Sequence, residues 1–274
     1  MRRNGVRLKR LENALATSQQ NATRIFEYVD ARIGKWPDIK ERDHFAFVSL
    51  SFLHKQMAHA RSVNVLLESG LASDASVIAR VMLEGLIYVS WMFQKADERA
   101  KKYREHALVS DYRTLLRKEA DGTPVPEAQK HKVTSRLSEL GSNHLKPEKG
   151  SQKHGKKNDT DPYQATWMYD DKGTKITISM MTEALGDRQL KSLYDELSQW
   201  SHWTVKGIGR ALVWDAQSVR LNSNNVHDAI LSCQAVIMAL TGTAIAVSAH
   251  LKLGMEDQLD SMRTSFVQDL KESE

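Results

Sequence analysis

A run of 21 residues, 229–249, contains no charged side chain. A helix of this length is long enough to cross the apolar part of a bilayer. The run also contains Gly242 and several serine, threonine and glutamine side chains, and no aromatic belt flanks it. We therefore expect it to form the central helix of a soluble bundle, whose small residues let neighbouring helices pack closely. No membrane partner is expected.

Helical spacing of apolar residues continues through most of the chain and predicts an all-α fold. Gly70 should separate two long helices, and the short connection there makes them antiparallel. Ser73 or Asp74 is suited to cap the second of these helices. The predicted helices cover residues 11–33, 39–67, 73–93, 97–119, 127–140, a short stretch ending at 185, 187–214 and 226–253. Residues 256–274 are expected to be either a charged amphipathic tail helix or a fraying end.

The sequence shows no internal repeat and no second core, so it predicts a single helical bundle with long antiparallel helices over residues 11–274. Residues 1–10 form a basic N-terminal arm in this prediction. Residues 145–162 contain five lysines and no apolar side chain after Leu145, which predicts a long, exposed basic loop. A solvated linker is the favoured interpretation of that loop, ahead of a phosphate-binding loop. A short hairpin is expected within residues 163–178.

The composition indicates a soluble globular protein, with 41% hydrophobic and 27% charged residues. The net charge of +5 is compatible with an anionic partner but does not identify one. Cys233 is the single cysteine, so an internal disulfide is excluded and a reducing cytoplasm is the expected compartment. The first ten residues are not followed by an apolar stretch, so a secretory signal is not expected.

Several familiar catalytic and cofactor-binding motifs are missing from the sequence. A di-iron bundle needs a pair of Glu-x-x-His motifs on two helices, and the chain lacks such a pair. The chain also has no His-Glu-x-x-His motif, no Walker loop, no dinucleotide fingerprint and no Gly-x-Ser-x-Gly elbow. His54 and His59 are five residues apart, which makes them poor joint ligands on a helix. We therefore expect neither a metal nor another cofactor.

The candidate site begins with Arg80 and Glu84, which lie one helical turn apart in an otherwise apolar helix. Arg61 and His54 lie on the preceding helix, and Ser198 lies one turn before His202 on a later one. Charged groups among core residues need partners. They form either a buried polar network that holds the helices in register or a functional site, and the residues leave both interpretations open.

A second candidate group lies on the polar helix predicted over residues 97–119. Arg99, Tyr103 and His106 are spaced so that they share one side of this helix. Arginine followed after four to six residues by histidine occurs twice in the chain, as Arg99 with His106 and Arg220 with His227. About two such matches are expected by chance, so this motif carries no information.

The sequence resembles a widespread prokaryotic family of all-helical domains of unknown function. The shared pattern is His, Arg, a Gly turn, Arg-x-x-x-Glu and a later Ser-x-x-x-His. In this chain it corresponds to His54, Arg61, Gly70, Arg80, Glu84, Ser198 and His202. The pattern is also similar to helical bundles of the higher eukaryote and prokaryote nucleotide-binding class, some of which are metal-independent ribonucleases in toxin and phage-defence systems. That resemblance implies a dimeric site that cleaves RNA with arginine and histidine.

We therefore expect a toxin-like or phage-defence-associated ribonuclease that binds RNA and forms a homodimer. His202 would act as base or acid, Arg61 and Arg80 would face the phosphate, and Glu84 would act as base or orient an arginine. The expected substrate-binding residues are Ser198, His54, Tyr103, Arg99 and His106. The alternative is a non-catalytic helical module that binds a small anionic ligand or a partner protein, such as one encoded in the same operon.

Overall fold

The structure is a computed structural model that describes residues 2–33, 38–140, 144–145, 162–164, 166–169, 174–201, 212–214, 219–221 and 225–273. The fold is all-α, as predicted, and within the described residues it also contains a single short two-stranded sheet.

The chain divides into two compact units. One unit comprises residues 1–94 and 178–274, and the second comprises residues 95–177, so the second is inserted into the sequence of the first. We call them the bundle unit and the inserted unit. That residues 11–274 form one domain remains a prediction, and the structure adds that two compact units lie within it.

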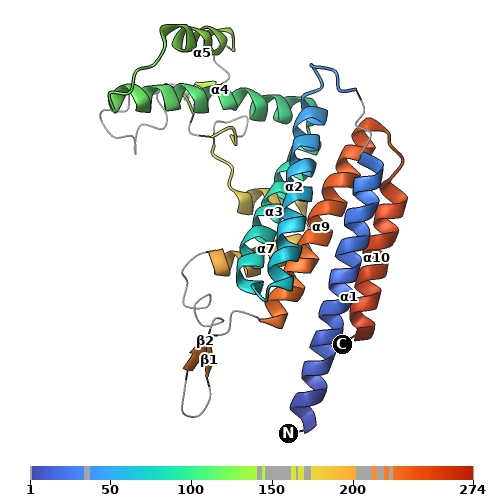
Figure 1. Cartoon of the computed structure of the whole chain (residues 1–274). Coiled ribbons are helices and arrows are strands. Elements are labelled where there is room, and N and C mark those ends of the chain that lie inside the picture. Colours follow the sequence, from blue (N-terminus) through green and yellow to red (C-terminus); the bar gives the residue numbers. More distant parts are fainter. Residues whose placement is uncertain are drawn as a thin grey trace. The chain divides into compact units, whose positions relative to one another are not determined.

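The bundle unit consists of long helices and a small hairpin (Figure 1). Its elements are α1 (Arg2–Ile33), α2 (His44–Glu68), α3 (Ala72–Phe93), α6 (Ile178–Leu185), α7 (Arg188–Ser201), β1 (Leu212–Trp214), β2 (Val219–Leu221), α9 (Val226–Leu251) and α10 (Glu256–Ser273).

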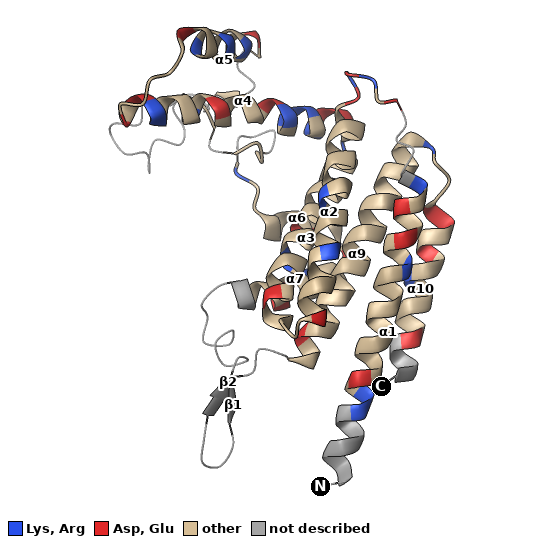
Figure 2. Ribbon diagram, in the orientation of Figure 1, with Lys and Arg blue, Asp and Glu red and all other residues tan. Residues whose placement is uncertain are grey.

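Helix α9 is the centre of the bundle unit, because it packs against α1, α2, α3, α7 and α10. Asp228 is its only Asp, Glu, Lys or Arg residue, and most of the helix is uncharged in Figure 2. Ile237, Leu240 and Val247 are at most 1% exposed. The uncharged run is therefore a core helix, as predicted. In the described part of the chain, α3 and α9 are long and apolar enough to span a membrane, and 72% of the apolar stretch of α9 is buried inside the protein.

Small residues bring α3 and α9 close together. The Ser76 and Ser232 hydroxyl oxygens lie 3.0 Å apart, and both side chains are fully buried. A Cβ atom at Gly242 would lie only 2.6 Å from the Leu86 Cδ1 atom. The predicted role of small residues in close helix packing therefore applies to this contact.

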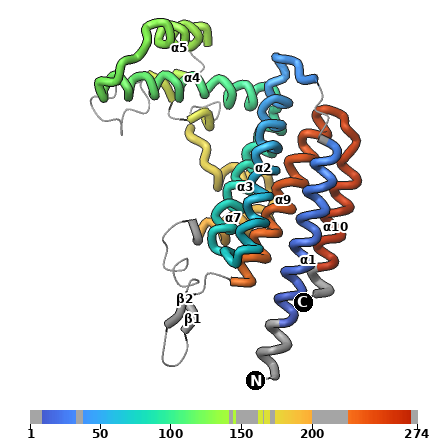
Figure 3. The backbone as a smooth tube through the Cα atoms, viewed as in Figure 1, coloured from blue at the N-terminus to red at the C-terminus, as the bar shows by residue number. Residues whose placement is uncertain are grey.

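Helices α2 and α3 form the predicted antiparallel pair, and they lie side by side in the tube of Figure 3. Gly70 has a φ of +73°, and the Leu71 amide donates to the Leu66 carbonyl, which is the usual way to end a helix. The predicted cap of the second helix was wrong, because α3 begins at Ala72 and has no side-chain cap.

The predicted start of α2 at residue 39 was also wrong. This helix begins at His44, and the Asp43 carboxylate accepts a hydrogen bond from the Ala46 amide at 2.9 Å. The same carboxylate lies 2.9 Å from His250 Nε2 at the end of α9. Asp43 therefore joins the start of α2 to the end of α9, a contact between residues far apart in the sequence.

Helices α1 and α10 lie side by side along α9 (Figure 3). Asn21 Nδ2 donates to Asp269 Oδ2 at 3.2 Å across this pair. The tail helix is confirmed, and the first helix begins at Arg2 instead of residue 11. Residues 2–10, predicted to be a basic arm, are therefore the first turns of α1.

The helix predicted over residues 187–214 is too long. Its start is confirmed, since the Asp187 carboxylate accepts from the Leu190 amide at 2.9 Å. Residues 212–214, however, form β1, which pairs antiparallel with β2. Gly207 and Gly209 disfavour a continuous helix, and the leucine, valine and tryptophan of β1 suit a strand. Residues 202–211 lie outside the described residues.

The inserted unit contains the two predicted helices, α4 (Ala96–Ala120) and α5 (Glu127–Glu139). Val109 and Leu115 of α4 pack with Val133 and Leu137 of α5 to form its core. The predicted hairpin is represented by an isolated antiparallel bridge between Tyr169 and Lys175. Residues 146–161, most of the expected basic loop, lie outside the described residues.

Candidate functional site

A connected group of polar side chains joins α3 to α7 in the bundle unit. We call Arg80, Glu84, Tyr194 and Ser198 the Arg80 cluster. Arg80 Nη2 lies 2.7 Å from Glu84 Oε1 and donates to the Tyr194 hydroxyl at 3.0 Å. Arg80 Nε donates to the Ser198 hydroxyl at 3.1 Å. The Tyr194 hydroxyl in turn donates to Glu84 Oε1 at 3.2 Å.

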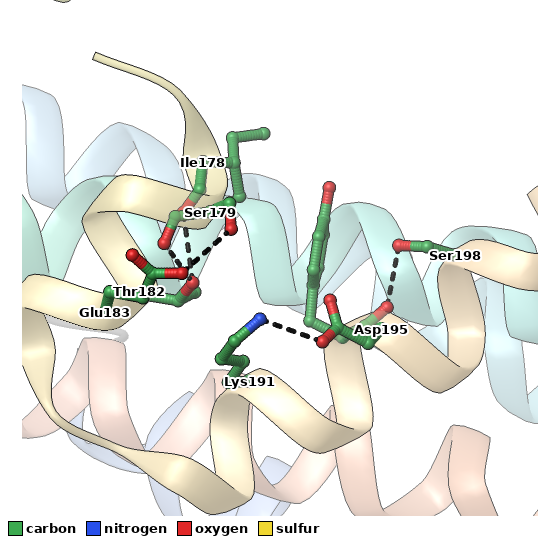
Figure 4. Close-up of polar contacts among 8 residues, drawn as sticks. Ile178, Ser179, Thr182, Glu183, Lys191, Asp195 and Ser198 are labelled. Atoms are coloured by element: carbon green, nitrogen blue, oxygen red, sulfur yellow. Dashed lines mark hydrogen bonds and ion pairs between the residues drawn. The ribbon is translucent and has the colours of Figure 1, made fainter.

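Helical spacing explains why these four side chains meet. Arg80 and Glu84 are four residues apart on α3, and Tyr194 and Ser198 are four apart on α7, so each pair shares one side of its helix. The two helices pack against each other. Figure 4 shows the Ser198 hydroxyl, which also donates to the Tyr194 carbonyl at 2.7 Å. The same figure shows the ion pair of Lys191 with Asp195 on α7, whose atoms lie 3.0 Å apart.

The Arg80 cluster is partly exposed. The side chains of Arg80 and Glu84 are 16% and 22% exposed, so neither is sealed by apolar neighbours. Arg80 uses Nε and Nη2, and Glu84 uses Oε1. Within the part of the chain that the structure describes, Arg80 Nη1 and Glu84 Oε2 make no hydrogen bond. The pair therefore has a donor and an acceptor left for a ligand.

Tyr194 was missed by the sequence analysis. Burial raises the pKa of its phenol, with nearby Glu84 raising it further and Arg80 lowering it. The hydroxyl therefore keeps its proton at neutral pH and can donate to Glu84. The Tyr194 ring also packs against Arg80, whose Cζ lies 5.2 Å from the ring centroid. The available signal was its spacing, since Tyr194, Ser198 and His202 follow one another every four residues.

The structure does not bring Arg61 to the Arg80 cluster. The Arg61 side chain is 65% exposed, and Nη2 lies 3.5 Å from the Asp30 carboxylate of α1. Its guanidinium lies 5.0 Å from the centre of the Phe26 ring, also on α1. The expected convergence of Arg61 with Arg80 was therefore wrong, because position 61 of α2 faces α1. His54 is exposed on α2, and His202 lies outside the described residues.

Arg99, Tyr103 and His106 lie on α4 and thus belong to the inserted unit. The Tyr103 and Trp167 rings pack edge to face with centroids 5.1 Å apart, and burial raises the pKa of Tyr103. Arg99 is half-buried. The substrate-binding role of these three residues stays a prediction.

His106 belongs to a group that we call the His106 cluster, together with Arg113, His144 and Glu105. His106 Nε2 lies 3.2 Å from the Gln164 carbonyl, and Arg113 Nη2 donates to the same carbonyl at 2.9 Å. His144 Nε2 lies 3.3 Å from Glu105 Oε2. The cluster thus attaches residues 144 and 163–164, which flank the expected basic loop, to α4.

The electrostatics of the His106 cluster favour a neutral His106. Burial is the largest cause that lowers the pKa of His106, the nearby His144 and Arg113 lower it further, and the bond to Gln164 opposes them. Neutral His106 can donate its Nε2 proton to the Gln164 carbonyl. This bond and those of Arg113 go to main-chain oxygens. We therefore interpret the cluster as an anchor that holds residues 163–164 on α4.

The described residues offer neither a reactive thiol nor a metal-binding group. Cys233 is buried, and burial raises the pKa of its thiol to about 12, so it is not a thiolate nucleophile at neutral pH. Among the residues that the structure describes, no three His, Cys, Asp or Glu side chains are grouped so that they could hold a metal ion.

Comparisons with known proteins identify a family. The searches of curated proteins and of solved structures found no match. The model of a family of unknown function, DUF5677, matches residues 46–218, a range that extends from α2 to beyond β1 and includes the whole Arg80 cluster. The expectation of an uncharacterised domain family is thereby confirmed. Since the match covers more than half of the chain, this protein belongs to the family of unknown function DUF5677.

Proposed function

We propose that this protein is a metal-independent ribonuclease whose site is the Arg80 cluster. One observation carries the proposal: Arg80 and Glu84 form a partly exposed ion pair in which, within the described part of the chain, Arg80 Nη1 and Glu84 Oε2 make no hydrogen bond. An RNA phosphodiester offers a phosphate oxygen for the donor and, on the neighbouring ribose carbon, a 2′-hydroxyl for the acceptor.

The reaction that fits these two atoms, Arg80 Nη1 and Glu84 Oε2, is attack on phosphorus by the RNA's own 2′-hydroxyl. Glu84 Oε2 accepts the 2′-hydroxyl proton, the 2′-oxygen forms a bond to phosphorus, and the bond from phosphorus to the 5′-oxygen breaks. Arg80 Nη1 donates to a phosphate oxygen as negative charge develops there. The leaving 5′-oxygen takes a proton from an acid, for which His202 is our candidate from the sequence. The products are a 2′,3′-cyclic phosphate and a 5′-hydroxyl.

The distribution of charge supports a polyanionic substrate. Residues 95–177 hold 18 Lys and Arg against 13 Asp and Glu, whereas the rest of the chain holds 21 of each. The inserted unit therefore carries the whole net charge of +5, and a local excess of this kind attracts nucleic acid. The same proposal includes the toxin-like or phage-defence role, the prokaryotic family pattern, the homodimer and the cytoplasmic location expected from the sequence.

The contacts of Arg80 also favour a second candidate function. Glu84 neutralises Arg80, and Tyr194 and Ser198 join both to α7, as in a network that fixes one helix on another. In that case Arg80 Nη1 and Glu84 Oε2 would bind a small anionic ligand or a partner protein, and the protein would not cleave it.

The test is cleavage of a labelled single-stranded RNA by the purified full chain in the presence of a metal chelator. We expect cyclic phosphate ends, no cleavage of the DNA of the same sequence, and about a 100-fold or greater loss of rate in Glu84→Gln and His202→Ala. Glu183→Gln is a matched control, because it changes an exposed carboxylate on the neighbouring helix α6, visible in Figure 4. A folded wild type that leaves RNA intact would overturn the proposal and favour the binding module.

A further inference from the structure

The Tyr194 hydroxyl touches both halves of the ion pair. It accepts a hydrogen bond from Arg80 Nη2 at 3.0 Å and donates one to Glu84 Oε1 at 3.2 Å. These are the same two atoms that form the ion pair at 2.7 Å. Arg80 Nη2, Glu84 Oε1 and the phenol oxygen therefore form a closed triangle of polar atoms.

This triangle changes how the two charged groups pair. An arginine and a carboxylate often pair through two parallel hydrogen bonds that occupy both carboxylate oxygens. In this protein Arg80 Nη2 donates to Tyr194 and lies 2.7 Å from Glu84 Oε1, and the same carboxylate oxygen accepts from the phenol. The ion pair is therefore held through one oxygen and one nitrogen, with Glu84 Oε2 and Arg80 Nη1 left over in the described part of the chain.

We propose that Tyr194 is a positioning residue that holds the Arg80–Glu84 pair in this single-contact form. Glu84 Oε2 then receives the 2′-hydroxyl proton, and Arg80 Nη1 faces the phosphate. This inference rests on the proposed ribonuclease function and assigns a role to a residue of that site which does not itself contact the substrate.

The position of Tyr194 argues against a role as the acid of the reaction. In an in-line displacement the attacking and leaving oxygens lie on opposite sides of phosphorus, so the base and the acid act from opposite sides. The Tyr194 hydroxyl is 3.2 Å from the carboxylate that acts as base. It is therefore on the side of the attacking oxygen, and its proton is directed at Glu84.

The decisive variant is Tyr194→Phe, which keeps the ring that packs against Arg80 and removes only the hydroxyl. We expect kcat on a short RNA to fall by about 10- to 100-fold, because the pair can close into its two-contact form, while KM changes little. We also expect the pH–rate profile to move, because the loss of the phenol changes the hydrogen bonds that the carboxylate receives.

Tyr28→Phe is the matched control. Tyr28 on α1 also packs against a guanidinium, with Arg32 Cζ 4.8 Å from its ring centroid, and it is far in the sequence from the Arg80 cluster. The kcat, KM and pH profile of the Tyr28→Phe variant should equal those of the wild type. A second probe, 3-fluorotyrosine at position 194, keeps the hydroxyl and makes it a stronger donor, so it should move the acid limb to lower pH.

The outcomes separate this inference from the proposed function. A wild type that does not cleave RNA overturns both. A wild type that cleaves, with Tyr194→Phe equal to it in kcat and pH profile, overturns the role of Tyr194 alone. A Tyr194→Phe variant that loses activity only in proportion to its folded fraction, with an unmoved profile, would show a structural role; if it does not fold, the 3-fluorotyrosine profile decides.

Discussion

The Arg80 cluster and the His106 cluster use similar residues in different ways. Both combine an arginine and a glutamate with ring side chains that can donate a proton: Tyr194 in the Arg80 cluster, and His106 and His144 in the His106 cluster. In the Arg80 cluster, Arg80 donates to the side-chain hydroxyls of Tyr194 and Ser198. In the His106 cluster Arg113 donates to the Tyr163 and Gln164 carbonyls. The acceptors of the two arginines, more than the residue types, distinguish the Arg80 cluster from the His106 cluster.

This difference separates a candidate site from an anchor. A ligand that bound Arg113 would break its hydrogen bonds to the Tyr163 and Gln164 carbonyls and so weaken the attachment of residues 163–164 to α4. In the part of the chain that the structure describes, Arg80 Nη1 and Glu84 Oε2 make no hydrogen bond, so the Arg80 pair can receive a ligand there while its existing bonds remain. A sequence that places charged residues on a helix does not reveal which of these arrangements will form.

The largest effect should come from Arg80→Ala. In the proposed mechanism the guanidinium faces the phosphate, and its removal also leaves Glu84 without its cation, so we expect RNA cleavage to fall by about 100- to 1000-fold. Initial rates on labelled RNA, with circular dichroism to confirm folding, provide the measurement. An equal loss in Arg113→Ala would erase the distinction between the two clusters.

Arg113→Ala should instead reduce stability. It removes two hydrogen bonds to main-chain carbonyls, and we expect the inserted unit to lose about 1–3 kcal/mol of unfolding free energy. Hydrogen exchange should speed up at the Gln164 amide, which donates to the His144 carbonyl. Arg117→Ala, an exposed arginine one turn further along α4, is the matched control and should leave this exchange unchanged.

A smaller effect should appear with pH. The pKa of His106 is lowered in the folded protein, mainly by burial, so between that value and 6.5 the unfolded chain binds more protons. The stabilisation is complete above pH 6.5 and is lost as pH falls through the folded-state pKa. Urea unfolding at pH 7.5 and 5.5 measures it. Burial also lowers the pKa of His59, so only the difference between wild type and His106→Gln reports on His106. If wild type and His106→Gln lose equal stability between pH 7.5 and pH 5.5, the anchor does not depend on neutral His106.

The smallest effect should come from Arg61→Ala. Its ion pair with Asp30 is exposed on both sides, and such pairs contribute about 0–1 kcal/mol. Cleavage of RNA should remain at the wild-type rate, because Arg61 packs on α1. A large loss of cleavage without a loss of stability would restore Arg61 to the proposed active site and contradict the placement described above.

Much of the fold could be predicted from local patterns. The spacing of apolar residues identified α3, α4, α5, α9 and α10, because a helix must direct its apolar side toward a core. Errors occurred at boundaries, where the competing forces are not local. The start of α2 depends on Asp43, which also contacts His250 at the other end of the chain, and no pattern near residue 43 reports that contact.

The candidate site was predicted in part. Arg80, Glu84 and Ser198 were chosen from four-residue spacing, and the structure brings these three together. Tyr194 was missed, since a tyrosine beside the apolar stripe of α7 is commonly a core residue. Arg61 was misplaced because helical spacing shows which residues share a side of α2 but not which helix faces that side.

The sequence by itself determined the all-α class, the buried central helix and the pairing of Arg80 with Glu84, because each follows from distances of a few residues along one helix. Only the tertiary structure decided that Tyr194 closes on this pair, that Arg61 faces α1 and that His106 binds a main-chain carbonyl. These contacts join residues that are 31 to 110 positions apart, so they depend on how whole helices pack.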